Sequence, residues 1–292
     1  MNYQQFWRRL AQVYNEGEAK AIARMVYEMR YGLSLSDIFL GKINQLTADD
    51  QAELEKILQR LLQNEPVQYV LGETEFCGRL FSVSPDVLIP RPETAELCGW
   101  IRKRFSQSPS PGNNGSGEAS PFILDIGTGN GCIAITLATE LPEAKVTAWD
   151  ISMKSLEIAK NNARRHQVDI HFQQVDILKL PHELGSTEGQ AFDLIVSNPP
   201  YICEKEKTTM EPHVLDYEPP TALFVPDDDP LVFYRAIGCY AISHLQPQGM
   251  LAVEINRAYG PETCELFKNI GFTDITLLTD SDGNDRFVIA TL

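Results

Sequence analysis

The stretch of sequence that most constrains the fold runs from Phe122 to Ala138. It begins with Phe122-Ile123-Leu124-Asp125-Ile126, a short apolar run typical of a buried strand. A glycine-rich segment follows, and then the apolar run Cys132–Ala138, which is typical of a helix. Strand, glycine-rich turn and helix make the half of a Rossmann-like unit that receives a nucleotide, because glycines let the backbone approach a ligand closely. We therefore expect an α/β fold with a cofactor bound at Gly127, Thr128, Gly129, Asn130 and Gly131.

Acidic residues follow the next two predicted strands. Asp150 ends the strand 145–149, where its carboxylate can accept hydrogen bonds from both hydroxyls of a ribose. Asp176 and Ile177 follow the strand 169–175, at a position suited to contact an adenine. The glycine segment alone is weak evidence for a nucleotide-binding site, and the order of these acidic residues along the chain strengthens it.

The spacing of the glycines selects among nucleotide cofactors. Dinucleotide enzymes normally carry G-x-G-x-x-G, whereas this chain has G-x-G-x-G, with Cys132 where the third glycine would fall. The pattern therefore implies no pyrophosphate. S-adenosylmethionine, a nucleoside without phosphate, fits better, and we expect it as the cofactor.

The tetrapeptide Asn198-Pro199-Pro200-Tyr201 follows a further apolar strand, Phe192–Ser197. Ligands of open α/β sheets bind at the carboxyl ends of strands. Asn198 offers an amide, each proline fixes its backbone, and Tyr201 adds a flat aromatic face. Together they predict a rigid clamp for a planar amide or an exocyclic amine, beside the cofactor. A plain turn that ends a strand is the alternative, since Asn and Pro are common in turns.

These motifs resemble the HemK family of S-adenosylmethionine-dependent N5-glutamine methyltransferases, which act on peptide chain release factors. The segment Leu88–Thr94 discriminates best, because the tetrapeptide also occurs in adenine-N6 methyltransferases. Three departures from the family pattern leave fine substrate choice open: Ala95, Ile177, and the run Ile255-Asn256-Arg257-Ala258-Tyr259 after Glu254. The remaining motifs of the resemblance are Gly72–Phe76, Tyr217–Leu223 and Asp282–Arg286.

The resemblance implies a class I methyltransferase fold, with a seven-stranded, mostly parallel sheet that has one antiparallel strand near its end. Residues 1–70 are then a small helical domain that recognises the protein substrate. Residues 71–92 form a hairpin and proline-turn connector, and residues 93–292 the methyltransferase domain. A Gly/Ser/Pro-rich segment at 106–121 is predicted to be a flexible insertion.

The resemblance also implies the reaction, transfer of a methyl group to the side-chain nitrogen of the glutamine in a release factor's Gly-Gly-Gln loop. An amide nitrogen is a poor nucleophile and the motifs contain no evident general base. We therefore expect the rate acceleration to come mainly from positioning the substrate amide. We expect the Asn198 side-chain carbonyl and the Pro199 backbone carbonyl to accept the two amide N–H bonds. Tyr201 is expected to stack on the amide plane. Two interpretations of Arg91 stay open: it contacts the carboxylate of the cofactor, or it forms an ion pair with Glu93.

Three other functions stay open from the sequence. The run Phe76-Cys77-Gly78 is similar to a sister group that methylates a ribosomal protein on glutamine, although Pro92-Glu93-Thr94 argues against it. An adenine methyltransferase acting on nucleic acid shares the clamp. A non-catalytic cofactor-binding module is expected to have lost Asn198 or Tyr201, and both are present.

Charge and composition narrow the choice of partner and compartment. The net charge of −15, from 25 basic and 40 acidic residues, disfavours a nucleic-acid substrate, since proteins that grip phosphate backbones need a basic face. The six cysteines are scattered without a C-x-x-C pair, which favours a reducing compartment and disfavours a metal site. There is no run of about 18 apolar residues for a membrane span. We expect a cytoplasmic, monomeric enzyme.

Helical periodicity dominates the sequence before Glu65. Phe6, Leu10, Val13 and Tyr14 lie at the spacing of one helix face. A second helix start is predicted at Thr47-Ala48-Asp49-Asp50. These stripes predict a small apolar core and no chemistry.

Overall fold

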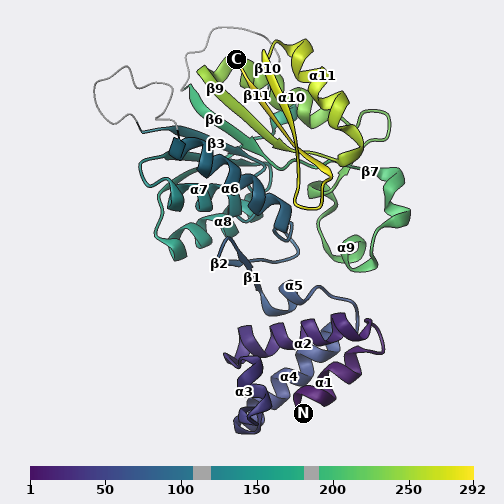
Figure 1. Ribbon diagram of the computed structural model, residues 1–292. Helices are drawn as coiled ribbons and strands as arrows, with labels where there is room; N and C mark the ends of the chain where they lie inside the picture. The colour runs from purple at the N-terminus through teal and green to yellow at the C-terminus, as the bar shows by residue number, and fades with distance from the viewer. Residues whose placement is uncertain (108–119, 181–190) are drawn as a thin grey trace.

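The computed structural model describes residues 1–107, 120–180 and 191–292. It consists of a bundle of short helices at the N-terminus and a larger α/β part, drawn one below the other in Figure 1. Most of the insertion predicted at 106–121 lies outside the described residues. In the described parts of the chain, no helix is both long and apolar enough to cross a membrane.

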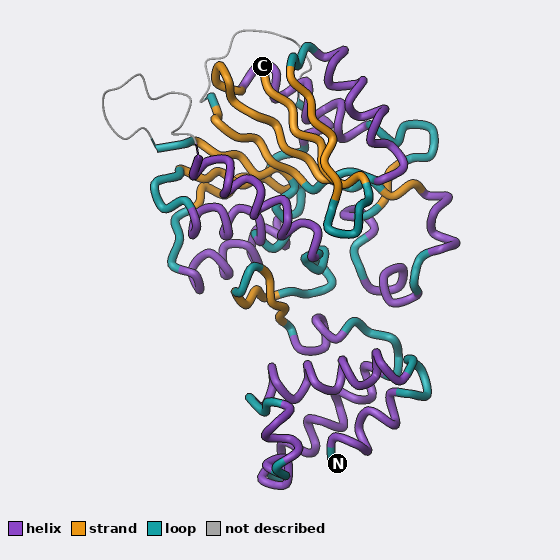
Figure 2. Tube along the Cα trace, in the orientation of Figure 1, coloured by secondary structure: helices purple, strands orange, loops and turns teal. Residues whose placement is uncertain are grey.

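A seven-stranded sheet forms the centre of the α/β part (Figure 2). Its spatial order is β10-β11-β9-β6-β3-β4-β5, and β11 alone runs antiparallel to its neighbours. The predicted fold class, including the single antiparallel strand near the end, is confirmed. The strands are β3 (Phe122–Ile126), β4 (Lys145–Asp150), β5 (Ile170–Gln174), β6 (Phe192–Ser197), β9 (Leu245–Glu254), β10 (Asp274–Thr279) and β11 (Asp285–Thr291).

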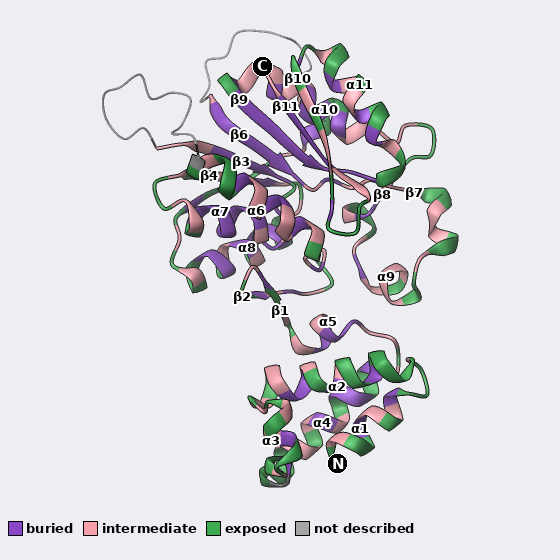
Figure 3. Ribbon diagram, in the orientation of Figure 1, coloured by how far each residue is buried: buried purple, intermediate pink, exposed green. Residues whose placement is uncertain are grey.

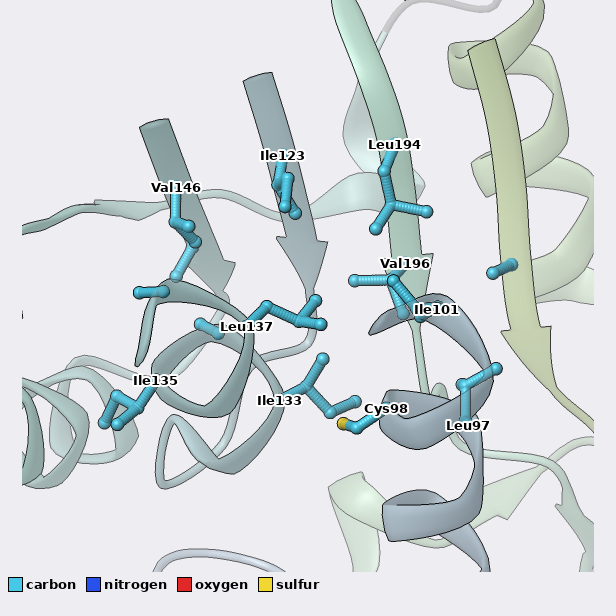
Figure 4. Packing of buried hydrophobic residues seen from close by; sticks show 14 of the residues in the cluster. Leu97, Cys98, Ile101, Ile123, Ile133, Ile135, Leu137, Val146, Leu194 and Val196 are labelled. Carbon is cyan, nitrogen blue, oxygen red and sulfur yellow. The ribbon is translucent and has the colours of Figure 1, made fainter. Parts of the chain in front are cut away.

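Helices cover both faces of this sheet, so that its central strands, such as β6 and β9, are buried in the middle of the domain (Figure 3). On one face, side chains such as Leu97 of α6 and Ile133 of α7 meet Ile123 and Leu194 of the sheet (Figure 4). The other face packs against α10 and α11 through residues such as Ile237. The helices are α6 (Pro92–Gln107), α7 (Cys132–Glu140), α8 (Met153–His166), α10 (Val232–His244) and α11 (Gly260–Ile270).

The N-terminal bundle packs its helices around a separate apolar core that includes Phe6, Val26 and Leu58. Thr47 caps the predicted second helix start, because its hydroxyl accepts the backbone N–H of Asp50. The helices are α1 (Tyr3–Leu10), α2 (Glu16–Tyr31), α3 (Leu35–Phe39), α4 (Ala48–Leu61) and α5 (Val67–Leu71), with a short 3₁₀ turn, η1, at Lys42–Gln45.

One detail of the predicted helical stripe is wrong. The first helix ends at Leu10, so Val13 lies in the following turn and is 42% exposed. The turn forms because Asn15 starts a new helix, with its side chain accepting the backbone N–H of Glu18.

A β-hairpin connects the two parts, with β1 (Glu73–Phe76) antiparallel to β2 (Arg79–Ser82). Tyr69 of α5 packs on Val83, Val87 and Ile89 beyond the hairpin, and its hydroxyl donates to the Val87 carbonyl at 2.6 Å. The segment between β6 and α10 forms a small region beside the sheet. It contains β7 (Ile202–Cys203), η3 (Glu204–Thr209), α9 (Pro212–Tyr217), η4 (Pro220–Ala222) and β8 (Phe224–Val225), and another 3₁₀ turn, η2, spans Ile177–Lys179.

Candidate cofactor and substrate site

The predicted site residues gather at one edge of the sheet. Ile126 of β3 is in register with Trp149 of β4 and with Ser197 of β6, and all three strands run parallel. The residues that follow them, Gly127, Asp150 and Asn198, therefore lie at the same edge. Chain order reverses between β3 and β6, and in open α/β sheets ligands bind in the crevice at such a reversal.

The glycine segment between β3 and α7 leaves room for a ligand. Gly127, Gly129 and Gly131 all have positive φ, at 75°, 57° and 86°, where side chains are strained. A Cβ on Gly127 or Gly129 would meet no atom within 4 Å, so both positions face open space. A Cβ on Gly131 would lie 3.2 Å from that of Ala159, so this glycine instead permits close packing of α7 on α8.

The two polar residues of this segment use their side chains to hold the turn. The Thr128 hydroxyl donates to Asp125 Oδ2 at 2.7 Å, and Asn130 Oδ1 accepts the Cys132 N–H at 3.2 Å. Thr128 and Asn130 are both buried, in keeping with side chains that hold the turn. Burial also raises the pKa of Asp125 to about 7, although Thr128 and a backbone N–H hydrogen-bond to it.

Asp150 lies directly beside the glycine segment. Its Oδ2 accepts the Gly129 N–H at 2.9 Å, and its Oδ1 accepts the Ser152 N–H at 2.8 Å. Burial raises the pKa of Asp150 despite these two backbone donors. A carboxylate has about four acceptor positions, so two remain for a ligand with vicinal hydroxyls.

The end of the crevice formed by β4 and β5 combines polar and apolar groups. Asp176 caps the turn after β5 by accepting the Leu178 N–H at 3.1 Å, and Ile177 is buried beneath. Ile151 and Leu178 are 56% and 39% exposed, unusual for large apolar residues. Sequence reasoning missed both, and the signal available was an apolar residue one position after Asp150 and two positions after Asp176.

The tetrapeptide at the end of β6 is tied to two residues that the sequence did not assign to the site. The Asn198 side-chain NH₂ donates to the Thr94 hydroxyl at 3.0 Å. Thr94, in the first turn of α6, donates in turn to Glu254 Oε2 at 2.6 Å. The Tyr201 hydroxyl donates to Glu254 Oε1 at 3.1 Å. Pro199, which lies between Asn198 and Tyr201 in the sequence, is buried.

Glu254 is the last residue of β9, the strand parallel to β6. It is 1% exposed, and burial raises the pKa of its carboxyl, against the lowering effect of its hydrogen bonds with Thr94 and Tyr201 and of the Arg286 charge. A single charged residue at the end of the apolar run 250–255 was the signal that could have identified it.

Arg91 pairs with Glu218 instead of Glu93, while its predicted contact with the cofactor carboxylate stays a prediction. Its guanidinium donates to Glu218 Oε1 at 2.6 Å, and Glu218 is 2% exposed. The other carboxylate oxygen, Oε2, is buried and finds no partner among the described residues. Next along the chain, the Tyr217 hydroxyl donates to the Gln63 carbonyl of the helical bundle at 2.8 Å, so this segment joins the two parts of the molecule.

Two family models match the chain in succession. The PrmC N-terminal domain matches residues 3–72, and a methyltransferase domain matches residues 120–267. The release factor glutamine methyltransferase of Bacteroides thetaiotaomicron is 44% identical over 96% of this chain and 95% of its own length. That of Flavobacterium psychrophilum is 42% identical over 98% and 97%.

This chain belongs to the release factor glutamine methyltransferase family. The predicted family and the predicted enzyme class, a methyltransferase that uses S-adenosylmethionine, are thereby confirmed. The methyltransferase domain of METTL16 shares the fold, with a TM-score of 0.50 and 16% identity over 72% of this chain and 87% of that one.

The residues of the crevice fit S-adenosylmethionine. Open space at Gly127 and Gly129 admits a ligand close to the backbone, and Asp150 retains acceptor positions for a ribose. S-adenosylmethionine is a nucleoside without phosphate, so its site needs no cluster of lysines or arginines. Within 1–107, 120–180 and 191–292, no three His, Cys, Asp or Glu side chains are grouped to hold a metal ion.

Proposed function

We propose that this protein methylates the side-chain amide nitrogen of the glutamine in the Gly-Gly-Gln loop of peptide chain release factors. The observation that carries the proposal is the position of Asn198, with its amide anchored through Thr94, next to the open glycine segment. The curated relatives are named for the same reaction on the same class of substrate. S-adenosylmethionine, when bound, supplies a methyl group on a sulfonium centre.

The cofactor is held, in this proposal, by residues from three strand ends. Gly127, Thr128, Gly129, Asn130 and Gly131 contribute backbone around it, and Asp150 accepts hydrogen bonds from the ribose. Asp176 and Ile177 contact the adenine, with Ile151 and Leu178 as additional apolar surface. Asn198 lies where cofactor and substrate meet.

The clamp supplies positioning and charge stabilisation rather than proton abstraction. The lone pair of an amide nitrogen is delocalised into its carbonyl, so its reaction depends on orientation, which is worth up to about 7–11 kcal/mol in favourable systems. Asn198 Oδ1 and the Pro199 carbonyl accept the two N–H bonds of the substrate amide. As positive charge develops on that nitrogen, both hydrogen bonds strengthen, so they favour the transition state over the ground state. Pro200 and Tyr201 complete the rigid wall of the clamp.

The protein partner is recognised outside the clamp. We infer that the helical domain, residues 1–70, binds the release factor, that residues 71–92 connect it to the catalytic part, and that residues 93–292 carry out the reaction. The net charge of −15 opposes a nucleic-acid substrate. All six cysteines are free thiols, in keeping with a reducing cytoplasm, and one chain contains every proposed site residue, so a monomer suffices.

A transfer assay with labelled S-adenosylmethionine tests this proposal. The acceptors are a release factor with its Gly-Gly-Gln loop, the same factor with the glutamine replaced by alanine, a ribosomal-protein preparation and duplex DNA. We expect label on the wild-type release factor alone. Label on the alanine variant or on DNA contradicts the proposal, and label on the ribosomal proteins alone favours the second glutamine methyltransferase group.

A further inference from the structure

A chain of hydrogen bonds joins the clamp to a buried carboxylate. Asn198 Nδ2 donates to Thr94 Oγ1 at 3.0 Å, and the Thr94 hydroxyl donates to Glu254 Oε2 at 2.6 Å. The Tyr201 hydroxyl donates to the other carboxylate oxygen at 3.1 Å. Thr94 and Glu254 are 2% and 1% exposed, so bulk water does not compete for these bonds.

The direction of each bond follows from the number of protons. An ionised carboxylate has none to donate, so Glu254 accepts from both hydroxyls. Thr94 has one hydroxyl proton, and once that proton is directed to Glu254 the oxygen can only accept. The group of Asn198 that faces Thr94 must therefore be the NH₂ group. Because an amide is planar, the oxygen of Asn198 then faces away from Thr94.

We propose that Thr94 and Glu254 are positioning residues that hold the Asn198 amide in the one orientation that presents Oδ1 to the substrate. The inference rests on the proposed role of Asn198 as a hydrogen-bond acceptor. In the flipped orientation Asn198 presents an NH₂ group to the N–H bonds of the substrate amide, and donor then meets donor. The two residues act through Asn198 and need no contact with the substrate.

The ionisation of Glu254 sets the direction of this network. A protonated Glu254 can donate to Thr94, and the Thr94 proton is then free to turn toward Asn198, which favours the flipped amide. The rate of methyl transfer by the enzyme–substrate complex therefore falls as pH drops through the pKa of Glu254, which burial raises above the ordinary carboxyl value. Thr94 is a neutral partner of this carboxyl. The titratable and charged groups that face it are Tyr201, Tyr234, Cys132, Glu93 and Arg286.

Substitutions at Thr94 test the proposal in combination with Asn198. Thr94→Val keeps the shape of the side chain and removes both hydrogen bonds, whereas Thr94→Ser keeps them. We expect kcat to fall about tenfold in Thr94→Val, with the KM for S-adenosylmethionine unchanged, and to return to near the wild-type value in Thr94→Ser. In an Asn198→Ala background there is no amide to orient, so Thr94→Val has no further effect on kcat.

The double substitution separates positioning from structural support. The proposal is overturned if Thr94→Val lowers kcat by the same factor in the wild-type and Asn198→Ala backgrounds. It is also overturned if Thr94→Val alone has the wild-type kcat. Wild-type enzyme that binds S-adenosylmethionine but labels no release factor instead overturns the proposed function, so the two failures are distinct.

Glu254→Gln provides an independent test if Thr94→Val does not fold. Gln has an NH₂ group that can donate to Thr94, so the direction of the network is lost at every pH. We expect kcat below the wild-type value at neutral pH and no fall in kcat between neutral and mildly acidic pH. A wild-type kcat with an unchanged acidic fall contradicts the proposal.

Discussion

The helical domain and the α/β domain of this protein differ in where they place polar groups. Ion pairs of the helical domain, such as Lys20–Glu16 and Arg30–Glu53, lie at the surface. In the α/β domain, Arg286–Asp280 and Arg91–Glu218 bury their carboxylates. Among the described residues, the buried Thr, Ser, Asn, Asp and Glu side chains all lie at Thr74 or beyond.

The buried groups of the helical domain thus serve mainly its folding, whereas the α/β domain also buries polar groups of the kind that chemistry requires. An apolar core and capped helix ends stabilise the helical bundle, and loss of either affects mainly stability. Buried polar groups cost stability unless they are fully hydrogen-bonded, and they are typical of sites that need oriented dipoles and shifted pKa values. We therefore expect substitutions in the two domains to change different measurements.

The largest effect is expected in the core of the helical domain. Leu58 is fully buried there, and Leu58→Ala should lower the free energy of unfolding by about 2–5 kcal/mol, because it leaves a cavity. Urea denaturation followed by circular dichroism measures this change. The Kd for S-adenosylmethionine should stay at the wild-type value, and loss of cofactor binding would contradict the separation of the two domains.

Asn198→Ala is expected to lower kcat by about 10²–10³, by analogy with the loss of one preorganised donor from an oxyanion hole. Cofactor affinity and the free energy of unfolding should change little, since Asn198 is only partly buried. The matched control is Asn15→Ala in the helical domain, which removes a helix cap and should leave kcat unchanged. Full turnover by Asn198→Ala would show that the clamp does not act as proposed.

Asp150→Ala should weaken cofactor binding rather than the chemical step. Hydrogen bonds to a charged group contribute about 1.5–3 kcal/mol, so we expect the Kd for S-adenosylmethionine to rise roughly 10–100-fold. Isothermal titration calorimetry measures the change. Asp169→Ala is the control, because Asp169 is an exposed residue just before β5, at the opposite end of that strand from Asp176. Equal Kd values for the two variants would remove Asp150 from the cofactor site.

The smallest effect is expected at a helix cap. The Thr47 hydroxyl accepts the Asp50 N–H, and Thr47→Ala should cost about 1 kcal/mol of stability. Thermal unfolding measures this loss, and methyl transfer to a release factor at a temperature well below the transition should be unchanged. A large loss of activity would mean that the start of α4 contributes directly to substrate binding.

The fold was predictable from the sequence where the determining interactions are local. Apolar runs and the residues that end them predicted β3, β4 and β6 closely, because a buried parallel strand needs a continuous apolar segment. Periodicity was less reliable at short turns. Val13 continues the helical spacing but lies beyond the end of α1, since the Asn15 cap starts the next helix there.

The clamp network was not predictable because its members are far apart in the chain. Asn198 and Thr94 are separated by 104 residues, and Thr94 and Glu254 by 160. Only the folded sheet brings the start of α6 to the ends of β6 and β9. The partner of Arg91 was missed for the same reason, since Glu218 is 127 residues away.

The most direct test of this account is to locate the transferred methyl group. A release factor treated with the wild-type enzyme and S-adenosylmethionine is digested and sequenced by tandem mass spectrometry, with the Asn198→Ala enzyme in parallel. The account predicts one methyl group on the side chain of the Gly-Gly-Gln glutamine with the wild-type enzyme, and at least a hundredfold slower appearance with Asn198→Ala. A methyl group on any other residue, or equal rates for the two enzymes, would contradict it.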